Sequence, residues 1–112
     1  MEFQISEAGA VTIVALNGDL DGQTATAVQA QLLPLIHPQC QILLDMRGVP
    51  YISSVGLRAL LLLYRKTVSV GGRIVLCGLS EMLHDTMLIT GFLDFFEAYG
   101  TVEEGLQALQ GD

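Results

Sequence analysis

Two adjacent serines, Ser53 and Ser54, occupy the point where a loop leads into the most hydrophobic helix that this sequence predicts. The run before them, residues 42–45, has the continuous apolar character of a buried strand. A serine at such a position can act in two ways. Its side-chain oxygen can cap the helix by accepting a hydrogen bond from one of the first backbone N–H groups. Its hydroxyl can also carry a phosphate, which those N–H groups and the helix dipole would stabilise.

The other reactive side chains lack the spacing that catalysis or metal binding requires. Cys40 precedes one predicted parallel strand and Cys77 ends another, roughly 13–17 Å apart at ~3.3 Å per residue, which is too far for a disulfide. We expect both to be buried thiols in a reducing compartment. The two histidines and two cysteines show no metal-ligand spacing, and the sequence has neither a Gly-x-Ser-x-Gly motif nor a phosphate-binding loop with a lysine. The sequence therefore predicts no enzyme activity, no cofactor and no metal.

A receiver domain phosphorylated on Asp45 is one alternative. That chemistry needs an acidic pair after an early strand and a lysine after a late strand. The only lysine in the chain is Lys66, which lies inside a predicted helix. The sequence therefore disfavours this alternative.

Composition narrows the class of protein further. The 112 residues carry a formal net charge of −7 with only five Lys and Arg, and 51% are hydrophobic. Nucleic acid and anionic membranes both require basic patches, so neither is expected as a partner. Residues 59–64 form the longest apolar stretch, far short of the ~20 residues of a membrane span, and no leader peptide is visible. We predict one cytoplasmic domain over residues 1–112.

Hydrophobic periodicity predicts an α/β fold. Strands are expected at residues 3–6, 11–16, 41–45, 73–77 and 96–99. Helices are expected from Thr24 to near Leu33, where Pro34 ends the helix, over 54–70, over 81–90, and after a Thr101–Glu104 capping box. The order β-β-α-β-α-β-α-β-α gives about five strands and about four helices. Right-handed crossovers make such a sheet mixed and mostly parallel, with the opening hairpin as its antiparallel edge.

The helix over residues 54–70 has two different faces. Leu57, Leu60 and Tyr64 fall on the side expected to face the core. The opposite side carries the apolar residues Val55 and Leu62 among Ser54, Arg58, Arg65 and Lys66. An apolar strip with a charged rim is typical of a protein-binding surface.

The segment from Asp45 to Leu60, with Tyr51-Ile-Ser-Ser-Val-Gly-Leu-Arg at its centre, resembles the signature of STAS domains, in particular the bacterial anti-sigma-factor antagonists. Residues 18–21, 71–78 and 90–96 resemble other segments of the same family, so the similarity covers nearly the whole chain. The resemblance implies that Ser54 is a phosphoacceptor. Many members carry Asp in place of Ser53 and Ser or Thr in place of Val55, so Ser53 is kept as a second candidate.

The resemblance also implies partners. One is a serine protein kinase of the histidine-kinase-like ATPase type, which also acts as an anti-sigma factor, and the other is a serine phosphatase. The unmodified chain would bind the kinase and phosphorylation would release it. The alternative is a constitutive STAS interaction module in which Ser54 only caps the helix. For Gly56, a role in admitting a kinase and a role in close packing stay open. The expected partner-binding residues are Asp19, Asp21, Tyr51, Ser53, Val55, Gly56, Arg58 and Leu62.

Overall fold

The predicted order of elements is confirmed by the computed structural model, which describes residues 1–111. Its five strands are β1 Glu2–Ala8, β2 Val11–Asn17, β3 Gln41–Gly48, β4 Arg73–Cys77 and β5 Glu97–Tyr99. Its helices are α1 Ala25–Leu32, α2 Ser54–Ser69, α3 Glu81–Ile89 and α4 Val102–Gln110, with 3-10 turns η1 Leu33–Leu35 and η2 Phe92–Asp94.

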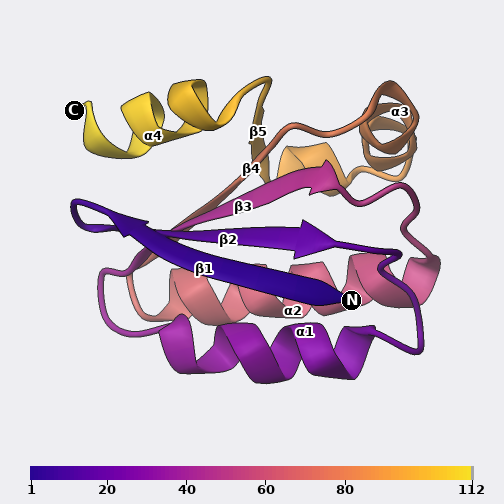
Figure 1. Ribbon diagram of the computed structural model, residues 1–112, viewed down its shortest axis with the longest axis horizontal. Coiled ribbons are helices and arrows are strands. Elements are labelled where there is room, and N and C mark those ends of the chain that lie inside the picture. Colours follow the sequence, from indigo (N-terminus) through magenta and orange to yellow (C-terminus); the bar gives the residue numbers. More distant parts are fainter. Residues whose placement is uncertain (112) are drawn as a thin grey trace.

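The five strands form one sheet in the order β1-β2-β3-β4-β5. Strands β1 and β2 pair antiparallel, and each later pair is parallel. The mixed, mostly parallel sheet expected from the sequence is thus confirmed. The carboxyl ends of β2 and β3 point to the same end of the molecule, where α1 and α2 begin (Figure 1). Loops that follow these ends are the usual place for function in such sheets.

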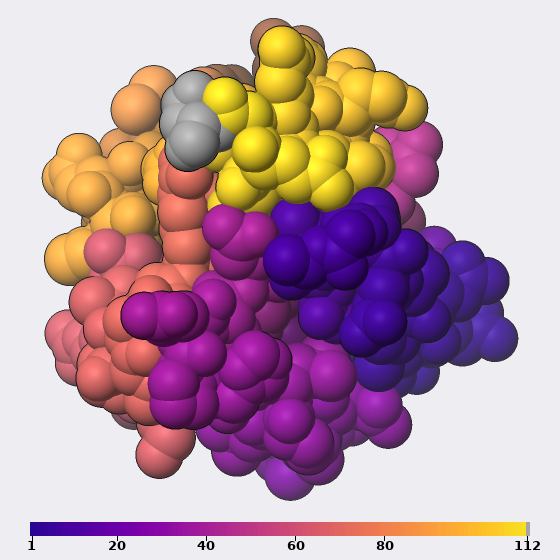
Figure 2. Space-filling view, turned by 90° about the vertical axis from the view of Figure 1, so that its left-hand side faces the viewer, coloured from indigo at the N-terminus to yellow at the C-terminus, as the bar shows by residue number. Residues whose placement is uncertain are grey.

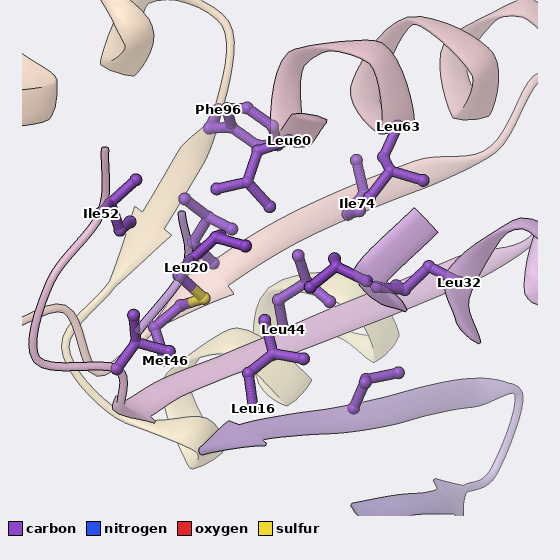
Figure 3. Close-up of a cluster of buried hydrophobic side chains, with 14 of the residues drawn as sticks. Leu16, Leu20, Leu32, Leu44, Met46, Ile52, Leu60, Leu63, Ile74 and Phe96 are labelled. Atoms are coloured by element: carbon purple, nitrogen blue, oxygen red, sulfur yellow. The ribbon is translucent and has the colours of Figure 1, made fainter. Parts of the chain in front are cut away.

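Helices α1 and α2 cover one face of the sheet, and α4 covers the other (Figure 1). The five consecutive residues from Ile42 to Met46 of β3 are all buried, as a strand covered on both faces requires. On the α1–α2 side, Leu20, Ile52, Leu60 and Phe96 come from four different segments and converge in one cluster (Figure 3). Helix α3 adds Leu83 and Met87 to this cluster.

On the opposite face, α4 packs Leu109 against a smaller cluster that includes Val11, Leu43 and Cys77. The end of α4 lies beside the β1–β2 hairpin (Figure 2), where the Gln110 amide donates to the Ala8 carbonyl over 3.0 Å. Burial raises the pKa of the Cys77 thiol to about 12. Both cysteines are buried and free, so the prediction of unbridged thiols is confirmed.

Two boundaries differ instructively from the sequence prediction. Helix α1 ends at Leu32, and Pro34 then fits into the 3-10 turn η1, which needs no N–H from it. Strand β3 continues to Gly48, three residues beyond the predicted end. Asp45 therefore lies inside a strand rather than on the loop after it. Among residues 1–111 no helix has the length and apolarity to cross a bilayer.

Candidate functional site

Two loops that are distant in sequence are joined by backbone hydrogen bonds at the carboxyl end of the sheet. The Gly18 N–H donates to the Gly48 carbonyl, and the Leu20 N–H donates to the Tyr51 carbonyl, each over 2.9 Å. The Ser53 N–H returns a bond of 2.9 Å to the Leu20 carbonyl. Leu20 and Ile52 form an isolated parallel bridge, with both side chains buried. The acidic loop and the double serine, which the sequence placed at separate points, thus form one surface.

Ser53 is the N-cap of α2. Its backbone is extended, with φ −87° and ψ 172°, and its Oγ accepts a hydrogen bond of 3.1 Å from the Gly56 N–H. Its carbonyl accepts the Leu57 N–H over 2.9 Å, which starts the regular helical bonding. The Ser53 hydroxyl is therefore already engaged in forming the helix.

Ser54 is the first residue of α2, and its side chain is exposed. Within residues 1–111 the structure gives its hydroxyl no hydrogen-bond partner. The cap belongs to Ser53 and not to Ser54, while the alternative of a constitutive interaction module stays open. The free hydroxyl lies at the end of α2 where backbone N–H groups point outward and the helix dipole is positive. This is a favourable environment for an added anion.

Gly56 has a packing role. It is buried, and a Cβ built on it would lie 2.4 Å from the Leu20 carbonyl oxygen, well inside van der Waals contact. The missing side chain lets α2 approach the Leu20 segment closely. Burial also removes Gly56 from the surface that a partner could touch, so its expected place among the contact residues is corrected.

Three predicted contact residues are exposed on α2 or in the loop that precedes it. Tyr51, Val55 and Leu62 keep 52%, 50% and 49% of their surface exposed. Arg58, one helical turn after Ser54, is exposed as well. The structure therefore leaves these large side chains uncovered on α2 and on the loop before it.

The two predicted carboxylates of the β2–α1 loop differ in role. Asp19 is exposed. Asp21 is half-buried, and its Oδ1 accepts hydrogen bonds from the N–H groups of Gln23 over 2.9 Å and Thr24 over 3.2 Å. Asp21 therefore stabilises the turn that starts α1, while Asp19 is the more accessible acid for a partner.

Asp45 does not belong to this surface. It is only 6% exposed, and Arg47 binds it with two hydrogen bonds, from Nε over 2.9 Å and from Nη2 over 2.7 Å. The side-chain hydrogen bonds from Arg47 hold the pKa of the Asp45 carboxyl below its ordinary value. A buried, paired carboxylate is a poor phosphoacceptor. Among residues 1–111 there is also no cluster of three or more His, Cys, Asp or Glu side chains that could hold a metal.

Sequence reasoning missed the bridge between Leu20 and Ile52. One signal for it was present, because an isolated leucine in the otherwise polar and glycine-rich loop of residues 17–22 needs a place to be buried. The division of roles between the two serines had no comparable signal. Either serine could be the residue at which the backbone turns helical.

Comparison with known proteins agrees with this geometry. The family model described as "STAS domain" matches residues 2–105, so the chain belongs to the STAS domain family. One relative is BtrV of Bordetella bronchiseptica, provisionally named an anti-sigma factor antagonist. It is 28% identical over 98% of this chain and 96% of its own length. The anti-sigma-B factor antagonist of Bacillus subtilis is 28% identical over 84% of this chain and 86% of its own.

Solved structures agree on the fold. A Thermotoga maritima protein, also provisionally described as an anti-sigma factor antagonist, superimposes with a TM-score of 0.88 at 18% identity, over 96% of this chain and 94% of its own. The Bacillus cell fate determinant SpoIIAA, solved in its phosphorylated form, gives a TM-score of 0.70 at 18% identity, over 97% of this chain and 100% of its own. The named relatives are thus regulators rather than enzymes.

Proposed function

We propose that this protein is an anti-sigma factor antagonist that switches partners through phosphorylation of Ser54. In the unmodified state it binds a serine kinase of the histidine-kinase-like ATPase type, which also acts as an anti-sigma factor. Phosphorylation of Ser54 releases that kinase, and a serine phosphatase restores the binding form. The observation that carries the proposal is the free, exposed Ser54 hydroxyl beside a neighbouring serine whose hydroxyl is already used as the cap.

The positive end of α2 makes the modification compatible with the fold. A phosphoserine adds about −1.5 to −2 charges at neutral pH. At the first position of a helix this charge is stabilised by the dipole and by free N–H groups. The Ser54 side chain points away from the core, so the phosphate displaces no packed residue. We therefore expect phosphorylation to leave the folded structure intact.

The same charge acts strongly on a bound partner. Tyr51, Val55 and Leu62 are exposed on α2 and the loop before it, on either side of Ser54 in the chain, and a partner that covers all three would also remove water from the Ser54 region. In a closed interface the phosphate on Ser54 would lose its hydration without gaining an opposite charge, and burying an unpaired charge is costly. Dissociation of the partner restores the hydration of the phosphate, so the modified form binds weakly. Phosphorylation would thus lower the affinity for the partner and leave the fold of the domain unchanged.

The test is phosphorylation followed by binding. The chain is incubated with ATP and an extract of its own cells, and the modified residue is located by mass spectrometry. We expect one phosphate on Ser54 in the wild type and in Ser53→Ala, and none in Ser54→Ala. The Ser53→Ala variant is the matched control, because it removes the adjacent hydroxyl.

Binding is then compared between Ser54→Ala and Ser54→Asp, using the purified kinase. We expect the alanine variant to bind and the aspartate variant to bind at least tenfold more weakly. Equal binding by the two variants would show a constitutive interaction module. If phosphate is found on Ser53 alone, then Ser53 and not Ser54 is the phosphoacceptor.

A further inference from the structure

The charged side chains of this protein are unevenly distributed among its helices. Helices α1 and α2, on one face, contain three basic side chains and no acidic one: Arg58, Arg65 and Lys66. Helices α3 and α4 and the η2 turn contain five acidic side chains and no Lys or Arg: Glu81, Asp85, Asp94, Glu103 and Glu104. In a chain of net charge −7, the α1–α2 layer is thus locally positive.

The three basic residues of α2 are also those that the fold leaves without an ionic partner. Of the five Lys and Arg residues in the chain, Arg47 pairs with Asp45 and Arg73 pairs with Glu97. Within residues 1–111 the structure shows no ion pair for Arg58, Arg65 or Lys66, and all three are exposed. Their charge is therefore available to another molecule.

These cations frame Val55 and Leu62, two of the three large apolar residues that α2 leaves exposed; the third, Val68, lies outside this group. At about 100° per residue, Arg58, Arg65 and Lys66 lie within a sector of about 100° that also contains Val55 and Leu62. From Val55 to Lys66 the strip is about 16 Å long, at ~1.5 Å per residue. We call these five residues the cationic strip.

The geometry points to a partner protein that presents the complementary surface: an apolar patch rimmed by Asp and Glu side chains that accept the three cations. The inference rests on the proposed function for the role of α2 in docking, and it adds the chemistry of the partner. Complementary charge sets orientation and association rate, while Val55 and Leu62 supply the apolar centre. A membrane or a nucleic acid fits less well, because the net negative charge of the whole chain opposes an extended polyanion.

The strip also connects to Ser54. Ser54 precedes Arg58 by four residues, so the two side chains are neighbours on the helix surface. A phosphate on Ser54 would offset up to about two of the three positive charges of the strip. It would thus weaken attraction to an acidic partner in addition to its own desolvation cost.

The test uses a defined probe and needs no kinase. The probe is a stapled helical peptide of sixteen residues with a leucine stripe flanked by glutamates, and its control is the same peptide with glutamines. Each is titrated into the isotopically labelled full chain, and amide chemical shifts are followed by NMR. We expect the acidic peptide to shift the amides of residues 54–66, with an affinity that falls as salt rises. The glutamine peptide should bind at least fivefold more weakly.

Two variants that change the net charge of the chain by the same amount, at different places, separate the effect of where a charge lies from the effect of total charge. Arg65→Gln removes one positive charge from the strip, and Gln107→Glu adds one negative charge on exposed α4, on the other face of the sheet. We expect Arg65→Gln to weaken binding of the acidic peptide about two- to fivefold and Gln107→Glu to leave it unchanged. Equal effects of the two variants would overturn the inference, as would shifts confined to other elements or equal binding of the two peptides.

Cross-linking can show directly whether Lys66 contacts the acidic peptide. Lys66 is the only lysine in the chain. A carbodiimide reagent should therefore join its amine to a glutamate of the bound peptide, and Lys66→Arg should lose this link while retaining affinity. Vesicles of anionic lipid form the comparison arm, and stronger binding to them than to the peptide would contradict a protein partner. If Ser54→Asp binds the peptide as well as the wild type does while Arg65→Gln binds it less, the docking chemistry stands and the proposed switch fails.

Discussion

Replacing each of the two serines by alanine should affect stability very unequally. In Ser53→Ala the Gly56 N–H loses its 3.1 Å hydrogen bond to Oγ. Gly56 is buried beneath the Leu20 segment, so water cannot readily replace that bond. Loss of a serine cap costs typically about 1 kcal/mol and up to ~2. We expect the upper part of this range, about 1.5–2 kcal/mol, which corresponds to a fall in Tm of roughly 6–9 °C for a domain of this size.

Ser54→Ala should change stability by less than about 0.5 kcal/mol in either direction. The Ser54 side chain is exposed, and the structure shows it without a hydrogen bond within residues 1–111. Alanine is also the better helix former at this position. Urea unfolding followed by circular dichroism measures both variants, and Ser53→Asp is a control that restores a capping oxygen. A larger loss in Ser54→Ala than in Ser53→Ala would refute the assignment of the cap, and with it the reason for regarding Ser54 as free.

Three further predictions concern the surroundings of the site. Gly56→Ala should lower the free energy of unfolding by about 2 kcal/mol, because its Cβ meets the Leu20 carbonyl; unchanged stability in urea would contradict the close approach. The lowered pKa of Asp45 means that its pair with Arg47 stabilises the fold above the ordinary carboxyl pKa of 3.8 and loses that effect as pH falls toward the folded-state pKa. The stability difference between wild type and Asp45→Asn should therefore shrink below about pH 4 in acid titrations monitored by circular dichroism, and a constant difference would argue against the pair. Cys77, with its pKa raised to about 12, should resist iodoacetamide at neutral pH until urea unfolds the chain, and mass spectrometry of the native protein would reveal any earlier labelling.

Much of the fold could be predicted from local pattern. The continuous apolar run of β3 and the amphipathic repeat of α2 each have a distinctive period, and Pro34 and Thr101 mark helix ends by mechanisms that act within a few residues. The exposed position of Val55 and Leu62 also followed from helical geometry alone. These features depend on neighbours in sequence, so the sequence determines them directly.

The site was less predictable because it depends on contacts between distant segments. The role of Gly56 could not be decided until Leu20 was placed against it, thirty-six residues earlier in the chain. Likewise, the continuation of β3 beyond Asp45 depends on its pairing with β2 near Asn17, where the register shifts. The unequal roles of Ser53 and Ser54 follow from a single turn of the backbone at the helix start.

The backbone bonds between Leu20 and the Tyr51–Ser53 segment have a mechanical consequence. Since each loop is hydrogen-bonded to the other as well as joined to the sheet, we expect Asp19 and Ser54 to keep a fixed relative position. The proposed kinase would therefore meet two loops that are already held together and would not have to order them on binding. Inserting one residue into either loop would change the relative position of Asp19 and Ser54 while the rest of the domain stayed folded.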